Sequence, residues 1–239
     1  MGFKCGIVGL PNVGKSTLFN ALTKSSIPAE NFPFCTIEPN VGKVPLPDPR
    51  LIDLNKIVGT KKIIPASLDL VDIAGLVQGA SQGEGLGNAF LSNIREMNAL
   101  AHVVRCFDDD NVTHVDGSID PVRDAEIINL ELILADLETV SKRLVKCEKL
   151  IKTNDKDNKI EYDLLNKIKD NLDSGKLINL EDFNDEEQKI IKSFQLLSSK
   201  PTFYIANISD DSKSEKKLNE LLEFAKKSGC IVIPTCIKI

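Results

Sequence analysis

The sequence lacks the features that would place it in a membrane or send it out of the cell. No apolar run among its 239 residues approaches the roughly 20 residues that a membrane-spanning helix needs. The N-terminus leads directly into glycine-containing sequence without a cleavable hydrophobic segment. Position 6 is Gly6, where a myristoylation signal would carry Ser or Thr. We therefore expect a cytoplasmic protein with no membrane partner.

Metal-binding cysteine pairs and an excess of positive charge are also missing. The six cysteines show no CxxC spacing and lie mostly in apolar stretches, which indicates reduced thiols. The formal net charge is −5, so a general attraction to nucleic acid is excluded and DNA is not an expected partner. The segment from Asp124 to Ser199 contains 17 acidic and 12 basic side chains and thus carries this entire excess.

What the sequence does contain is a series of short β-branched apolar runs separated by Gly and Pro. Such runs are typical of buried strands in an α/β sheet, and between Lys4 and Pro121 they are Cys5–Val8, Ser67–Val71 and His102–Phe107. Strand character returns at residues 203–206 and 231–233, with a helical stretch at 218–224 between them. The fold class expected is α/β with a mainly parallel sheet.

The apolar pattern changes after Asp120-Pro121, where spacings of three and four residues indicate a helix that packs on a helical partner. The positions are Leu130, Ile133, Leu137, Val140, Leu144, Cys147 and Ile151. A polar stretch at 153–159 predicts a turn, and a returning helix is predicted from Ile160, Leu164, Ile168 and Leu172. Asn184 and Glu187 resemble a capping box for a further helix. The α/β domain, residues 1–123 and 200–239, is thus expected to contain a helical insertion at 124–199.

The strongest functional motif is GLPNVGKS at residues 9–16, which matches GxxxxGK[ST] between a predicted strand and a predicted helix. Glycines let backbone N–H groups surround phosphates, and the helix N-terminus adds positive charge. Lys15 would neutralise β- and γ-phosphate oxygens, and Ser16 would bind Mg²⁺. We assign the phosphate cradle to Asn12, Val13, Gly14, Lys15, Ser16 and Thr17. A P-loop nucleoside triphosphatase with a bound purine nucleotide and Mg²⁺ is expected.

Three further stretches fit this interpretation, although each has an ordinary structural alternative. Asp72-Ile73-Ala74-Gly75 is a DxxG in which Asp72 would hold Mg²⁺ through water and Gly75 would donate its N–H to the γ-phosphate. DxxG also occurs in simple turns. Thr36 could complete the Mg²⁺ shell or belong to a proline-rich surface loop. Five glycines between Gly75 and Gly87 suggest a second nucleotide-ordered loop or a merely flexible one.

Taken together, the segments GLPNVGKS, NFPFCTIEPN, DIAGLVQGASQGEGLGNAFLSNIRE and HVVRCFDDDNVTHVDGSIDP resemble the YchF family of Obg-related GTPases. The resemblance covers nearly the whole chain. It implies a G domain with a helical coiled-coil insertion, hydrolysis of ATP with GTP as a weaker substrate, and association with the ribosome. The C-terminal TGS domain of that family is not expected within these 239 residues.

The resemblance also implies a catalytic role for a histidine. Leu76 follows the DxxG where common GTPases carry a Gln that orients the attacking water, and Leu cannot hydrogen-bond that water. The family's mobile histidine corresponds to His114, whose imidazole could orient water near neutral pH. The alternative is a loop histidine that packs against its neighbours. His102, inside a strand pattern, is expected to be structural. Asn12 resembles a feature of K⁺-stimulated members and implies K⁺ activation.

The base-recognition motif is Asn207-Ile208-Ser209-Asp210, where a standard guanine site reads NKxD. The missing lysine weakens guanine recognition and leaves Ile208 as an apolar platform for either purine. Asp210 departs from the family's usual Glu toward the GTPase pattern. A carboxylate would repel N1 of adenine, so ATP preference requires Asp210 to point away from the base. The alternative is a polar loop after a strand.

Three functional hypotheses remain open. The first is a slow cytoplasmic ATPase whose loops report the nucleotide state to a partner. The second is a nucleotide-gated adaptor for a ribosome or protein, in which turnover is incidental. The third is a GTP-preferring Obg-like GTPase.

Overall fold

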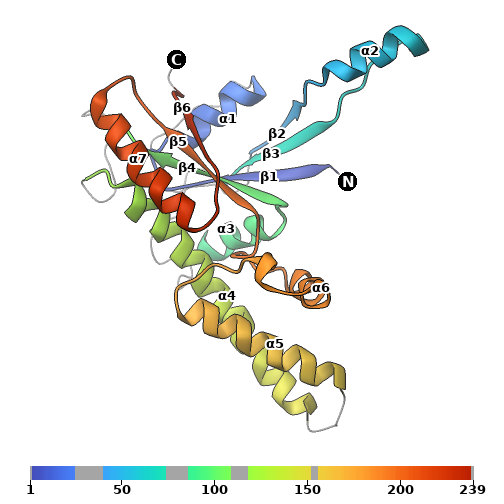
Figure 1. The fold of residues 1–239 in the computed structure, drawn as a ribbon, viewed down its shortest axis with the longest axis vertical. Coiled ribbons are helices and arrows are strands. Elements are labelled where there is room, and N and C mark those ends of the chain that lie inside the picture. Colours follow the sequence, from blue (N-terminus) through green and yellow to red (C-terminus); the bar gives the residue numbers. More distant parts are fainter. Residues whose placement is uncertain (1, 25–39, 74–85, 109–117, 152–155, 238–239) are drawn as a thin grey trace.

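The centre of the molecule is a six-stranded sheet with the strand order β2-β3-β1-β4-β5-β6 (Figure 1). The computed structural model describes residues 2–24, 40–73, 86–108, 118–151 and 156–237. β2 pairs antiparallel with β3, and the other neighbouring strands pair in parallel. The strands are β1 (Phe3–Val8), β2 (Asn40–Pro45), β3 (Ser67–Asp72), β4 (Ala99–Arg105), β5 (Thr202–Asn207) and β6 (Val232–Thr235). The mainly parallel sheet is confirmed.

Two groups of buried side chains surround this sheet. The larger group contains residues of β1, β3 and β4 together with residues of α1 (Lys15–Thr23), α3 (Leu86–Arg95) and the first part of α4 (Pro121–Ile151). The smaller group joins β4 and β5 to α7 (Ser212–Lys227). β4 is buried along its entire length, as expected for a central parallel strand that is covered on both faces.

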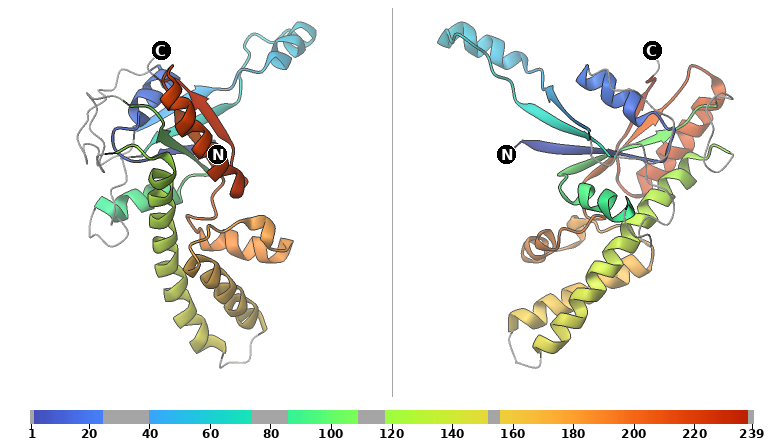
Figure 2. Two further views of the ribbon diagram at one scale, coloured as in Figure 1. Left: turned by 60° about the vertical axis from the view of Figure 1, so that its left-hand side comes forward. Right: turned by 180° about the vertical axis from the view of Figure 1, so that it is seen from behind.

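The helical insertion begins with α4, a helix of 31 residues that leaves the sheet and pairs with α5 (Lys156–Asp173). Figure 2 shows these two helices projecting side by side from the sheet. The 3-10 helix η1 (Leu180–Asp182) and α6 (Asp185–Phe194) follow before the chain returns to β5. Asn184 accepts hydrogen bonds from Glu186 N and Glu187 N, and Asn184 N donates to the Glu187 carboxylate. The predicted capping box is confirmed.

The predicted helical seam is wrong at two positions, where the side chains are exposed and not buried. Leu130 is 49% exposed and Ile160 is 52% exposed, whereas Ile133, Val140, Leu144 and Cys147 are buried with Leu164, Ile168 and Leu172. Leu130 lies where α4 still packs on the sheet, so α5 does not cover it. The predicted turn at 153–159 is also too long, because α5 is already helical at Lys156.

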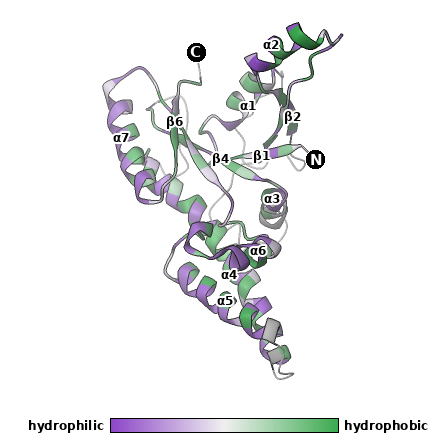
Figure 3. Cartoon of the chain, turned by 45° about the vertical axis from the view of Figure 1, so that its right-hand side comes forward, coloured by the Kyte–Doolittle hydropathy of each residue, from purple (hydrophilic) through white to green (hydrophobic). Residues whose placement is uncertain are grey.

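One helix, α2 (Pro49–Val58), was not predicted and stands at the far end of the β2–β3 pair (Figure 1). Asp48 caps its N-terminus by accepting from Arg50 N at 3.0 Å, and Pro49 occupies the first turn, where its missing N–H costs nothing. None of its residues is buried. Figure 3 shows both hydrophobic and hydrophilic residues along this helix.

Candidate functional site

The loop of residues 9–14 joins β1 to α1 in a conformation that needs glycine at both ends. Gly9 has φ +149°, and a Cβ there would lie 2.4 Å from the carbonyl oxygen of Val103. Gly14 has φ +103°, and its Cβ would lie 2.6 Å from Nδ2 of Asn207. Asn12 has φ 62°, a left-handed conformation that Asn tolerates better than most residues. The sequence thus forms the sharp strand–loop–helix turn that the motif predicts.

Lys15 opens α1 and is buried, with only 7% of its surface exposed. Its Nζ donates a hydrogen bond to the Leu10 carbonyl oxygen at 2.7 Å, so the side chain folds back over its own loop. Burial lowers the pKa of Lys15 to about 8, and the nearby Asp72 carboxylate opposes this shift. An anion bound in the loop would favour the charged ammonium in the same way.

Asp72 ends β3 beside the start of α1. Its Oδ2 accepts a hydrogen bond from Ser16 Oγ at 2.9 Å. Burial raises the pKa of this carboxyl, while the Ser16 hydrogen bond and the Lys15 charge lower it. The structure therefore brings together three residues from two sequence motifs, Lys15, Ser16 and Asp72.

The remaining predicted cradle residues take different positions. Val13 is buried in the main core, and Thr17 is exposed on α1. Thr36, Gly75 and His114 lie outside the described residues. His102 is buried in β4, with its ring centroid 5.2 Å from that of Tyr204. Burial lowers the pKa of His102 to about 3, so its imidazole stays neutral and its predicted structural role agrees with this position.

The base motif begins at the end of β5, directly beneath the phosphate loop. Asn207 is buried and donates from Nδ2 to the Val13 carbonyl oxygen at 2.9 Å, while its Oδ1 accepts from Ile237 N at 3.4 Å. Asn207 thus fastens the phosphate loop to the segment after β6. Ile208 is partly buried against the cluster beneath α7, and Asp210 is exposed.

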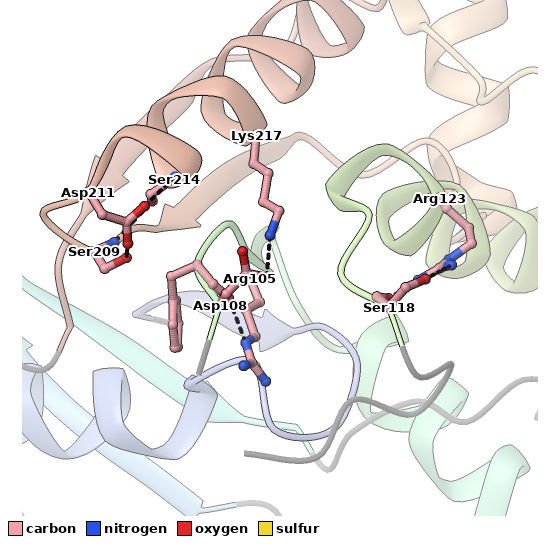
Figure 4. A network of polar contacts seen from close by, with 9 residues as sticks. Arg105, Asp108, Ser118, Arg123, Ser209, Asp211, Ser214 and Lys217 are labelled. Carbon is pink, nitrogen blue, oxygen red and sulfur yellow. Dashed lines mark hydrogen bonds and ion pairs between the residues drawn. The ribbon is translucent and has the colours of Figure 1, made fainter. Parts of the chain in front are cut away.

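The next residue, Asp211, was not singled out by the sequence analysis. It caps α7, accepting from Ser214 N at 2.7 Å and from the Ser209 hydroxyl (Figure 4). The Ser209 hydrogen bond is the main reason that the pKa of Asp211 is lowered. Its place three residues before Ser214, at a helix start, is a recognisable N-cap signal. The Asp211 carboxylate is therefore used as the N-cap of α7, whereas Asp210 is exposed at the surface.

Further polar contacts hold the chain beyond β4 (Figure 4). Lys217 on α7 forms an ion pair with Asp108, and Arg105 donates from Nε to the Phe107 carbonyl oxygen at 3.0 Å. The Arg105 guanidinium also lies 4.7 Å from the Phe107 ring centroid. Arg123 donates to the hydroxyl and the carbonyl oxygen of Ser118. The Lys217–Asp108 ion pair joins residues that are 109 positions apart. No sequence motif indicated this contact.

Within the described ranges, no group of three or more His, Cys, Asp or Glu side chains is arranged to hold a metal. None of the described helices is both long and apolar enough to span a membrane.

Comparison with known proteins shows the family to which the chain belongs. Residues 4–137 match the family model described as 50S ribosome-binding GTPase. Ribosome-binding ATPase YchF of Escherichia coli O157:H7 is 52% identical over the whole chain, and that of Bacillus subtilis strain 168 is 51% identical. The chain spans 66% of the length of each.

A solved structure extends the comparison to the fold. The Schizosaccharomyces pombe YchF GTPase is 38% identical and superimposes with a TM-score of 0.78. The alignment covers 99% of this chain and 66% of that one. The chain belongs to the 50S ribosome-binding GTPase family, and these three relatives, which match it along nearly its full length, are YchF proteins.

Proposed function

We propose that the protein is a Mg²⁺-dependent P-loop triphosphatase that hydrolyses ATP, with GTP as a weaker substrate, and acts as a ribosome-associated nucleotide switch. The observation that carries this proposal is the proximity of Lys15, Ser16 and Asp72 at the start of α1, where Ser16 Oγ donates a hydrogen bond to Asp72 and, against the lowering effect of burial, the Asp72 carboxylate raises the pKa of Lys15. It places a buried cation, a hydroxyl and a carboxylate where a triphosphate would meet a helix N-terminus.

Some of the residues at the start of α1 would bind the phosphates, and others would bind the metal ion. Lys15 would reach the β- and γ-phosphates, and backbone N–H groups of residues 12–17 would surround them. Ser16 and Thr36 would offer hydroxyl oxygens to Mg²⁺, which prefers oxygen donors, and Asp72 would hold the ion through water. The ion would neutralise charge on the phosphate oxygens during transfer. K⁺ at Asn12 is a further proposed activator.

Hydrolysis also needs a group that orients water. We assign this role to His114 because Leu76 cannot hydrogen-bond water. The Gly75 N–H would bind the γ-phosphate and so report its presence. Ordering of Thr36 and of the Gly75–Gly87 loop by the nucleotide would constitute the switch.

ATP preference is supported by the names of the full-length bacterial relatives, which are ribosome-binding ATPases. Ile208 stands where a guanine site carries Lys, and it packs partly against the α7 cluster, so this position would offer a purine an apolar surface. One observation favours the GTPase alternative: Asp210 is exposed, and its neighbour Asp211, not Asp210, caps α7. A free carboxylate there could accept hydrogen bonds from guanine.

The domain limits and the partner are part of the same proposal. Residues 1–123 and 200–239 would form the nucleotide-binding domain, and residues 124–199 would present the helical surface to a ribosomal partner in the cytoplasm. The relatives' names support a ribosomal partner.

A phosphate-release assay at saturating Mg·ATP and Mg·GTP tests the enzymatic proposal. We expect turnover with both nucleotides and faster turnover with ATP. Nucleotide binding without measurable release would favour the adaptor hypothesis, and faster turnover with GTP would favour the Obg-like GTPase.

A further inference from the structure

The helical insertion and the sheet have separate hydrophobic cores that meet at two pairs of adjacent residues. On α4, Leu132 packs in the core of the sheet and Ile133 packs in the core of the insertion. On the returning segment, Leu197 belongs to the first core and Leu196 to the second. The boundary between the sheet core and the insertion core therefore lies between Leu132 and Ile133 on α4 and between Leu196 and Leu197 on the returning segment.

Asp136 lies one turn beyond this boundary on α4 and is only 1% exposed. Its carboxylate accepts hydrogen bonds from Leu197 N at 2.9 Å, Ser198 N at 2.8 Å and Ser198 Oγ at 2.6 Å. These three donors offset part of the cost of burying the charge. α4 and the returning segment are thus held together by one buried side chain.

Lys200, two residues further on, fastens the same segment to the end of α3. Its Nζ donates to the carbonyl oxygen of Arg95 at 2.9 Å and to that of Met97 at 2.6 Å. The last carbonyl groups of a helix lack partners within the helix and carry partial negative charge, so an ammonium group satisfies both needs. Lys200 therefore caps α3.

A third contact closes the ring between α3 and α4. The Arg95 Nη2 donates to Thr139 Oγ1 at 3.2 Å, one turn beyond Asp136. Figures 1 and 2 show α3 beside α4 at the level where α4 leaves the sheet. The contacts of Arg95, Asp136, Thr139 and Lys200 will be called the α3–α4 junction.

We propose that the α3–α4 junction transmits the nucleotide-dependent position of α3 to the orientation of the α4–α5 hairpin. The proposal rests on the proposed nucleotide switch, and it adds the route by which that switch reaches the helical insertion. α3 is the helix that follows the Asp72 motif in the chain. Because the junction is made of directional hydrogen bonds to a buried carboxylate and to helix carbonyls, a shift of α3 must either move α4 with it or break those bonds.

The test measures the distance between the hairpin and the sheet with and without nucleotide. Spin labels are attached through ketone-bearing amino acids at Glu148 on α4 and Lys43 on β2, both exposed, so that the native cysteines stay unlabelled. Distances are measured by double electron–electron resonance on the 239-residue chain, with and without Mg²⁺ and a non-hydrolysable ATP analogue. Calorimetry on the same samples records analogue binding.

We expect the analogue to shift the distance in the wild type and the shift to be lost in Lys200→Met, with the analogue's Kd unchanged. Lys200→Met removes the ammonium and keeps most of the aliphatic chain. The matched control is Lys169→Met on α5, whose ammonium pairs with Asp173 at the surface and whose loss should leave the shift intact.

If the distance shift seen in the wild type persists in Lys200→Met, the proposed role of the junction is overturned. It is also overturned if the wild type binds the analogue without any distance shift. If Lys200→Met does not fold, Thr139→Val decides, because it removes the Arg95 contact and keeps the buried carboxylate; an undiminished shift in that variant again overturns the proposal. Failure of the wild type to bind the analogue would instead contradict the proposed function.

Discussion

At the scale of single residues, Lys15 is the side chain with the clearest expected effect. Its burial and its hydrogen bond to Leu10 hold the ammonium at the loop that would receive the phosphates. A hydrogen bond to a charged group contributes about 1.5–3 kcal/mol. We therefore expect Lys15→Ala to raise the Kd for a Mg·ATP analogue by about 10- to 150-fold, measured by calorimetry.

The control for this variant is Lys62→Ala, which removes an exposed lysine on the segment after α2. It should leave the Kd unchanged. Equal affinity of Lys15→Ala and the wild type would show that the P-loop lysine does not contact the nucleotide.

A second prediction at this scale concerns His114. We expect His114→Ala to keep the analogue's affinity and to lower the rate of phosphate release, because orienting water matters in the transition state and not in the bound ground state. His102→Asn is the comparison, since His102 is buried in β4 and should affect stability more than turnover. Unchanged release by His114→Ala would remove this residue from the mechanism.

At the scale of elements, the capping box of α6 is a local structure that the sequence predicted and the structure confirms. Asn184 satisfies two N–H groups at the helix start. Asn184→Ala should cost about 1 kcal/mol and lower the Tm by about 2–4 °C. The control Asn219→Ala changes an exposed Asn inside α7, and a thermal scan that shows equal losses in both variants would contradict a capping role.

Elements that depend on distant contacts were predicted less well. The apolar spacing predicts one continuous seam from Leu130, yet the start of α4 packs on the sheet, with Ala125 and Ile128 in the two cores around it. Periodicity identifies a helix and its apolar face but not which neighbour covers that face. The helix α2 was not predicted, although its sequence carries signals for both ends, the Asp48 cap with Pro49 at the start and Gly59 at the end.

At the scale of the whole molecule, the sequence predicted the α/β class and the parallel sheet, since buried strands appear as short apolar runs. The spacing of GLPNVGKS placed Lys15 and Ser16 at the start of a helix, and the structure confirms this. Asp72 was assigned to the same site from the order of motifs, and its hydrogen bond with Ser16 confirms their proximity.

The junction between the two bodies could not be predicted. Asp136 and Ser198 are 62 positions apart, and neither belongs to a motif. From the sequence alone, a buried Asp in a helix with many charged residues cannot be told from an Asp that faces solvent. Its role became visible only when the returning segment was placed beside α4.

The central claim is that this molecule binds ATP in preference to GTP at the loop of residues 9–16. Parallel calorimetric titrations of the Mg²⁺-loaded protein with non-hydrolysable ATP and GTP analogues test it most directly. We expect tighter binding of the ATP analogue, which would mean that Asp210 does not pair with the base as a GTPase aspartate does. Tighter binding of the GTP analogue would contradict the account and assign Asp210 to guanine recognition.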